Sequence, residues 1–197
     1  MGETRRSMAS ITQRTAESEF DLVIVGSGAG ALSAALAADT LGHRAIVLEK
    51  QARFGGSTAI SGGVLWVPNN PLMSEEGIED SYDRARTYLD AAVPVEAPFT
   101  SPARRDTFLR VGPVLVSFLR ELGMTFFRPE GWSDYYDDLP GGEPRSRCLM
   151  PPLFDARVLG SWAKKLARSP VGDGMPVHSH ELTDLYLVRR TWRGKRM

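Results

Sequence analysis

The sequence contains very little cysteine and histidine. Its 197 residues include one cysteine, Cys148, and three histidines. A single cysteine excludes an internal disulfide, and no histidine partner that would activate Cys148 as a nucleophile is evident, so we interpret it as an ordinary thiol. His178 and His180 could bind a metal only together with further ligands. No other Cys or His lies near them in the sequence, so no metal site is expected.

An excess of charge of either sign and long apolar runs are also absent. Lys and Arg number 24, as do Asp and Glu, so the net charge gives no reason to expect a nucleic-acid partner. No stretch approaches the ~18 consecutive apolar residues of a membrane span. Residues 1–19 are polar and lack the apolar core of a secretory signal, which predicts a disordered tail and a cytoplasmic protein. The remaining composition, 42% hydrophobic, is that of an ordinary globular domain.

Residues 20–49 carry the pattern of a dinucleotide-binding site. An apolar, β-branched run, LVIV at 22–25, predicts a buried parallel strand. The glycine-rich turn GSGAGA follows at 26–31, then an Ala- and Leu-rich helix and a second apolar strand at 45–48. Gly26 allows the tight turn, Gly28 lets a pyrophosphate approach the backbone, and Ala31 is small enough for close helix–strand packing. The start of the helix faces the phosphates with free N–H groups.

Glu49, at the end of the second strand, can accept hydrogen bonds from a ribose hydroxyl. A carboxylate at this position argues against NADP, whose 2′-phosphate it would repel. The pattern alone leaves FAD and NAD open.

The segment after Glu49 favours FAD. Residues 51–63, QARFGGSTAISGG, together with the preceding turn, resemble the flavoprotein family of fumarate reductases and 3-ketosteroid dehydrogenases. In that family these Gly/Ser/Thr segments line the flavin side of the site. The alternative is a flexible Gly/Ser loop without a ligand. The motif and the resemblance together predict these cofactor-binding residues: Gly26, Gly28, Gly30, Ala31, Glu49, Lys50, Gly55, Gly56, Ser57, Thr58, Ser61, Gly62 and Gly63.

Residues 132–147, WSDYYDDLPGGEPRSR, form a second informative segment. They resemble a loop of 3-ketosteroid dehydrogenases in which Asp-Tyr precedes Pro-Gly-Gly, and in which the tyrosine helps to form the steroid pocket and supports the catalytic base. Tyr135 is the matching residue and Tyr136 the alternative. The chain departs from the family pattern where Arg145 follows a proline. From the residues alone, both tyrosines would be surface aromatics.

Other elements follow from apolar spacing and turn residues. Helices are predicted over 78–93, 104–122, 161–167 and 181–190, with a kink or restart of the second at Gly112-Pro113 and Gly123 as its C-cap. Short strands are predicted over 64–67 and 124–127. Trp66 in the first of these strands could either line the flavin or substrate pocket or belong to the core.

The fold class expected is α/β, a Rossmann-like FAD-binding domain that is incomplete at its C-terminus. Only one βαβ unit is evident in the sequence, whereas a dinucleotide fold needs several parallel strands covered on both faces. We therefore predict that residues 20–197 are the N-terminal part of an FAD-binding domain, truncated before the substrate domain. The resemblance implies that the base and the ketone-polarising groups lie beyond Met197, so that the chain alone is inactive.

Three functions remain open from the sequence. The first is a 3-ketosteroid Δ1-dehydrogenase, which abstracts a proton next to the ketone, passes a hydride to flavin N5 and needs an electron acceptor. The second is a fumarate-reductase-like enzyme, which would need an arginine and histidine set for a dicarboxylate. The third is a non-catalytic remnant that binds a nucleotide weakly or binds nothing. The Trp-Val-Pro-Asn stretch at 66–69 and the Tyr135 loop favour the first.

Overall fold

The computed structural model describes residues 19–169, 178 and 181. The described residues form two compact units. The first contains the residues up to Ile60 together with Ser161–Arg168, and the second contains Ser61–Gly160. The predicted tail over 1–19 lies outside the described residues except for Glu19, and the helix predicted over 181–190 lies outside them except for Glu181.

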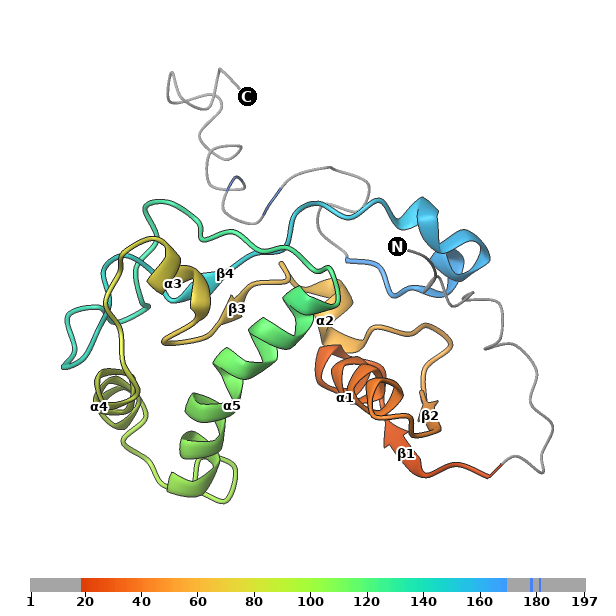
Figure 1. Cartoon of the computed structure of the whole chain (residues 1–197), viewed down its shortest axis with the longest axis horizontal. Coiled ribbons are helices and arrows are strands. Elements are labelled where there is room, and N and C mark those ends of the chain that lie inside the picture. Colours follow the sequence, from red (N-terminus) through yellow and green to blue (C-terminus); the bar gives the residue numbers. More distant parts are fainter. Residues whose placement is uncertain (1–18, 170–177, 179–180, 182–197) are drawn as a thin grey trace, which may run out of the picture. The chain divides into compact units, whose positions relative to one another are not determined.

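The first unit is built on one βαβ motif (Figure 1). Strand β1 (Leu22–Val25) and strand β2 (Ala45–Leu48) pair in parallel, joined by helix α1 (Ala29–Thr40). Helix α2 (Gly56–Ile60) follows. The two predicted strands are confirmed residue by residue. The strands form because β-branched runs favour strands, and α1 forms between them because Ala and Leu are strong helix formers. Gly42, with φ 79°, ends α1 by donating its N–H to Asp39 O.

The prediction that β1 is buried is wrong for most of its residues. Ile24 is buried, but Val23 is 58% and Val25 83% exposed. Successive side chains of a strand point to opposite faces, so Val23 and Val25 share the face opposite Ile24. Within the described residues the sheet has two strands and one helix packed on it, which leaves that face without cover. Leu48, which pairs with Val25, is also exposed.

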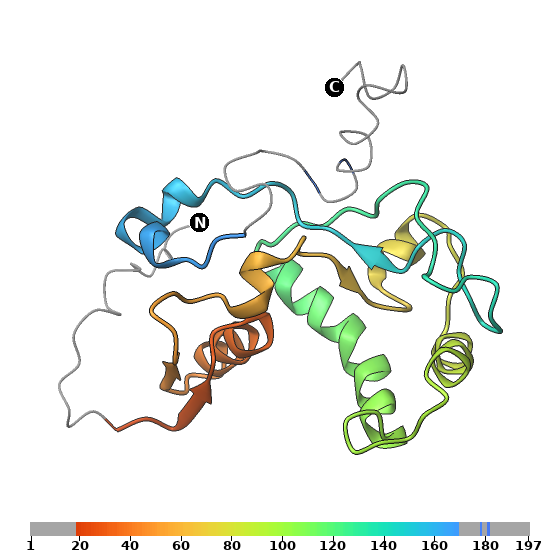
Figure 2. The same ribbon diagram turned by 180° about the vertical axis from the view of Figure 1, so that it is seen from behind.

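The second unit packs three helices on a short antiparallel ribbon (Figures 1 and 2). Strand β3 (Leu65–Trp66) pairs with β4 (Cys148–Leu149). The helices are α3 (Pro71–Glu75), α4 (Tyr82–Ala92) and α5 (Pro102–Glu121). Each helix is preceded by an N-cap residue whose side chain accepts a hydrogen bond from a backbone N–H in the first turn; these residues are Asn70, Ser81 and Ser101. The core contains Val67, Leu72, Val116 and Leu149.

Several predicted boundaries differ from the observed ones. Helix α4 begins only at Tyr82, because Ser81 caps it. Helix α5 runs through Pro113 as one helix, so a restart there is excluded. Proline has no backbone N–H to donate within the helix, and the burial of Val116 and Leu119 on the inner face compensates for that lost hydrogen bond. Gly112 lets α5 approach Val67, the residue after β3, since a Cβ on Gly112 would lie 3.1 Å from Val67 Cγ1.

Two further predictions fail in detail. The strand predicted over 124–127 reduces to one isolated bridge between Phe127 and Met150. The helix predicted over 161–167 belongs to a 3-10 segment, η2 (Ala156–Lys165), interrupted at Gly160, which has φ 57°. Within the described part of the chain, no helix combines the length and apolar composition needed to cross a membrane.

Candidate functional site

The turn between β1 and α1 has the backbone that a dinucleotide needs. Gly26 has φ 92°, a left-handed conformation that a side chain would strain, and its N–H donates to Leu48 O at 2.7 Å. Gly28 is the N-cap residue of α1, and its backbone is extended without a side-chain cap. The first N–H groups of a helix have no intrahelical acceptor, so Gly30 and Ala31 place such groups at the mouth of this turn.

The second glycine-rich segment packs directly against the first. A Cβ on Gly56 would lie 3.4 Å from Gly28 Cα, which shows how closely the two backbones approach. Ala29 N–H donates to Thr58 Oγ1 at 3.1 Å. Gly56, Ser57 and Thr58 belong to helix α2 and not to the flexible loop that was the alternative interpretation. Two motifs predicted separately therefore meet in one place.

Glu49 is held by a residue that the sequence analysis missed. Ser27, which is 3% exposed, donates its hydroxyl to Glu49 Oε2 and accepts Gly55 N–H at 2.9 Å. Gln51 N–H donates to Glu49 Oε1 at 2.9 Å. The Ser27 hydrogen bond, followed by that from Gln51, lowers the pKa of Glu49. An ionised carboxylate therefore stands at the end of β2, where a ribose hydroxyl can donate to it.

The conformation of Gly55 locks this arrangement. Its φ is 108°, and a Cβ there would lie 2.5 Å from Ala59 Cβ. Its neighbour Phe54 bonds on both sides to a distant segment, donating its N–H to Lys165 O and accepting Ala167 N–H, each at 2.8 Å. The sequence analysis predicted residues 165–167 as part of a helix and missed their pairing with Phe54, because nothing local indicates it.

The remaining predicted residues are distributed over both units. Lys50 is exposed directly after Glu49 in the first unit. Ser61, Gly62 and Gly63 belong to the second unit, where Gly63 has φ 69° and donates its N–H to Ser61 Oγ at 3.1 Å.

The residues of the first unit fit an adenine dinucleotide. Side-chain-free backbone at Gly26, Gly28 and Gly56 leaves room for a pyrophosphate, the start of α1 supplies N–H donors, and Glu49 supplies a carboxylate acceptor. This combination defines a nucleotide-binding α/β unit. These are the residues predicted to hold FAD, the α1 N-terminus for its pyrophosphate and Glu49 for a ribose hydroxyl.

The comparisons with known proteins identify the family. Residues 21–191 match the FAD binding domain, and the chain belongs to this family. A 3-oxosteroid 1-dehydrogenase from Mycobacterium tuberculosis is 43% identical over 144 residues, which are 73% of this chain and 25% of that protein. One from Mycolicibacterium smegmatis is 39% identical over 180 residues, 89% of this chain and 31% of that protein.

A solved structure agrees. The crystal structure of 3-ketosteroid delta1-dehydrogenase from Sterolibacterium denitrificans in complex with 1,4-androstadiene-3,17-dione matches with a TM-score of 0.75 and 33% identity. The matched region covers 90% of the present chain and 31% of the Sterolibacterium denitrificans chain. The expected FAD-binding α/β fold and FAD as cofactor are thereby confirmed. The chain spans between a quarter and a third of the length of these relatives.

Tyr135, the predicted substrate-side residue, is at the surface of the second unit. It is 89% exposed, and its ring meets that of Tyr136 edge-on at 5.0 Å between centroids. Trp66 packs inside the unit, stacked on Phe108 and tilted against Tyr88. These ring contacts favour the core role of Trp66 over the pocket role, the two that its sequence left open.

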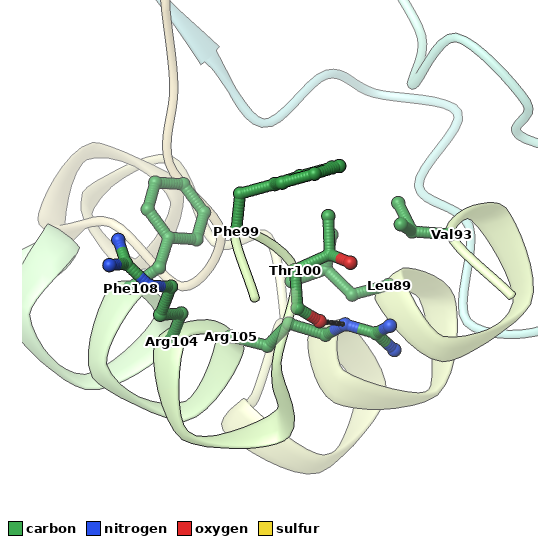
Figure 3. A pocket seen from close by; sticks show the side chains of 7 residues that line it. All are labelled: Leu89, Val93, Phe99, Thr100, Arg104, Arg105 and Phe108. Atoms are coloured by element: carbon green, nitrogen blue, oxygen red, sulfur yellow. Dashed lines mark hydrogen bonds between the residues drawn. The ribbon is translucent and has the colours of Figure 1, made fainter. Parts of the chain in front are cut away.

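An apolar pocket between α4 and α5 contains none of the predicted residues (Figure 3). One of its polar residues, Arg105, is engaged within the unit, since it binds Asp90 and the carbonyl oxygens of Thr100 and Val95. These bonds hold the loop before α5 against α4. The pocket is lined by Leu89, Val93, Phe99, Thr100, Arg104, Arg105 and Phe108.

Replacing Ser27 by alanine is expected to weaken FAD binding on the order of tenfold, because a hydrogen bond to a charged group contributes about 1.5–3 kcal/mol. The variant frees the Glu49 carboxylate and leaves Gly55 N–H without its acceptor. Titration of the flavin-free chain with FAD, followed by flavin fluorescence, measures the effect. Ser33→Ala, in the middle of α1, is the control and should bind as the wild type does. Equal affinities for both variants would contradict the role of Ser27.

Proposed function

We propose that this chain forms the cofactor side of an FAD-dependent dehydrogenase that acts on a 3-ketosteroid. The observation that carries the proposal is the likeness to proteins named for this activity. Two such relatives are 43% and 39% identical to the chain. A structure in complex with a 3-ketosteroid matches 90% of the chain. We also propose that a separate electron acceptor reoxidises the reduced cofactor.

The reaction introduces a double bond beside the ketone. The ring carbon next to the carbonyl loses a proton to a base, and the neighbouring carbon loses its hydrogen with both electrons of the bond. FAD, when bound, would supply the acceptor for this hydride, the hydrogen together with both electrons. The chain's own residues supply the cofactor cradle described above and, through Tyr135, one contact to the substrate side.

We infer that neither Tyr82 nor Tyr88 of the second unit is the base. Tyr82 donates its hydroxyl to Asp106, and burial raises the pKa of Tyr88, so that less of its phenol is ionised near neutral pH. We therefore propose that the chain binds cofactor and substrate without completing turnover.

A dicarboxylate substrate is less well supported. Such a substrate needs arginines that are free to bind carboxylates. In the described second unit, three well-buried arginines are already bound to carboxylates of the chain: Arg105 to Asp90, Arg128 to Glu76 and Arg147 to Asp80. This favours a neutral ketone over a dicarboxylate.

The test uses the FAD-loaded chain and 4-androstene-3,17-dione. Saturation-transfer NMR should show contact between steroid and protein, and Tyr135→Ala should weaken it several-fold. Phe99→Ala, another strongly exposed aromatic of the second unit, is the matched control and should leave the contact unchanged. Under anaerobic conditions the flavin absorbance should not bleach. Absence of any steroid contact would overturn the proposal, and bleaching would show that the chain holds a complete catalytic set.

A further inference from the structure

A buried ion cluster includes Asp134, the residue that directly precedes the exposed Tyr135. Arg147 is 0% exposed and binds two carboxylates whose side chains are also 0% exposed. It holds Asp80 with two parallel bonds, Nε to Oδ2 at 2.8 Å and Nη2 to Oδ1 at 2.7 Å, and Asp134 with Nη1 to Oδ2 at 2.6 Å. The bidentate geometry fixes both distance and orientation. We call Asp80, Arg147 and Asp134 the acidic–arginine cluster.

Asp134 is bound on every side. Its Oδ1 accepts the indole N–H of Trp66 at 2.7 Å, and its Oδ2 also accepts Glu143 N–H at 3.0 Å. Its backbone N–H donates to Glu143 O at 2.9 Å. On the other side of Tyr135, Tyr136 N–H donates to the phenol oxygen of Tyr88 at 3.2 Å. Tyr135 therefore stands between two anchored residues while its own side chain is 89% exposed.

Two residues with left-handed backbone conformations lie next to this cluster. Among the described residues, two that are not glycine have positive φ: Asn69 at 52° and Ser146 at 65°. Asn69 N–H donates to Asp80 Oδ2 at 2.8 Å, and Ser146, which is fully buried, directly precedes Arg147. Such conformations cost about 1–3 kcal/mol each and persist where the surroundings hold them, typically near functional sites.

Stability alone does not account for the cluster. Removing two carboxylates and a guanidinium from water costs several kcal/mol per ion, and well-packed apolar residues often stabilise a protein equally well. The bonds do fix one geometry, since each pairing is directional. The feature they fix is the backbone that presents Tyr135 (the blue-green loop beside α4 in Figure 1).

We propose that Asp134, clamped by Arg147 and Asp80, is a positioning residue that holds the Tyr135 phenol at the substrate. The proposal rests on the function proposed above. Its specific content is that Asp134 acts on substrate binding through Tyr135 and not through the stability of the unit.

A double-mutant cycle separates these roles, because it isolates the interaction of two residues from their separate effects. Affinity of the FAD-loaded chain for 4-androstene-3,17-dione is measured for the wild type, Asp134→Asn, Tyr135→Ala and the double variant. Asp134→Asn keeps the size of the side chain and removes the charge that Arg147 binds. We expect it to weaken binding on the order of tenfold, and the double variant to bind no more weakly than Tyr135→Ala.

Two further measurements complete the test. Fluorine NMR of the chain carrying fluorotyrosine should show a shifted Tyr135 signal on steroid addition in the wild type and a reduced shift in Asp134→Asn. Asp155→Asn is the matched control, because Asp155 forms an exposed pair with Arg157 in the same unit, and it should stay within about twofold of the wild type.

The outcomes distinguish the two proposals. No steroid binding by the wild type would overturn the proposed function and this inference with it. Binding that is unchanged in Asp134→Asn would overturn the inference alone. Equal losses from Asp134→Asn with and without Tyr135 would also overturn it, because the aspartate would then act through general stability.

Discussion

Replacing Arg147 by methionine is expected to lower the free energy of unfolding by about 3–5 kcal/mol near neutral pH, because it leaves buried carboxylates without their counter-ion. Both partner carboxylates, Asp80 and Asp134, are fully buried. Methionine matches the length of the arginine stem, so lost packing contributes little. Urea unfolding, followed by circular dichroism, measures the effect. Arg157→Met is the control: Arg157 is 91% exposed, and its loss should cost less than about 1 kcal/mol.

The pH dependence gives this prediction a second test. Burial raises the pKa of Asp80, but hydrogen bonds from Arg147 and Asn69, together with the arginine's charge, bring it below its ordinary value. A depressed pKa in the folded state contributes stability above the unfolded pKa, about 3.9, and loses it as the pH falls through the folded value. In Arg147→Met burial still raises the pKa of Asp80, while only the backbone hydrogen bonds from Asn69 and Ser81 lower it, so Asp80 protonates more readily.

The difference between wild type and Arg147→Met should therefore be largest near neutral pH and shrink as the pH falls below about 4. A difference that stays constant over this range would show that packing, and not charge, dominates the effect of Arg147.

Replacing Gly141 by alanine is expected to lower the free energy of unfolding by about 3 kcal/mol or more, since the added Cβ would strike the backbone of α4. It would lie 2.3 Å from Arg84 O and 2.8 Å from Tyr88 N, and neither atom can move without disturbing the helix. Gly141 also has φ 80°, which disfavours any side chain.

The matched control for this variant is Gly131→Ala. Gly131 precedes the same loop with a similar φ of 76°, but no atom lies within 4 Å of the added Cβ. It should cost about 1 kcal/mol, from backbone strain alone. Thermal unfolding of both variants isolates the steric contribution. Equal losses in the two variants would mean that the loop moves away from α4 at little cost.

The elements around the predicted nucleotide site were predictable because the sequence signals that form them are local. A β-branched run, glycines at a turn and an Ala-rich helix each act within a few residues, and β1, α1 and β2 appear where these signals lie. Capping shows the same locality: Ser81, not the apolar spacing that begins at Ile78, decides where α4 starts.

The contacts that organise the sites were not predictable, because they join distant segments. The hydroxyl of Ser27 gains meaning only from Gly55 and Glu49, and Phe54 only from residues 165–167. Arg147 resembles any surface arginine in the sequence, and its buried ion pair is with Asp80, two residues before α4 begins. The Pro-Gly-Gly motif was recognised by resemblance, while its physical reason, the approach of Gly141 to α4, is visible only in three dimensions.

Within the described residues, one face of the β1–β2 pair has no cover, and this has a thermodynamic consequence. Two strands with a single helix bury little apolar area, and sheets of this size are marginal in water. A ligand that binds only the folded form adds RT ln(1 + [L]/Kd) to the stability, about 2.7 kcal/mol at a hundredfold excess over Kd. For so small a βαβ unit this is a large share of the total. Folding of the unit and binding of FAD would then be one linked equilibrium.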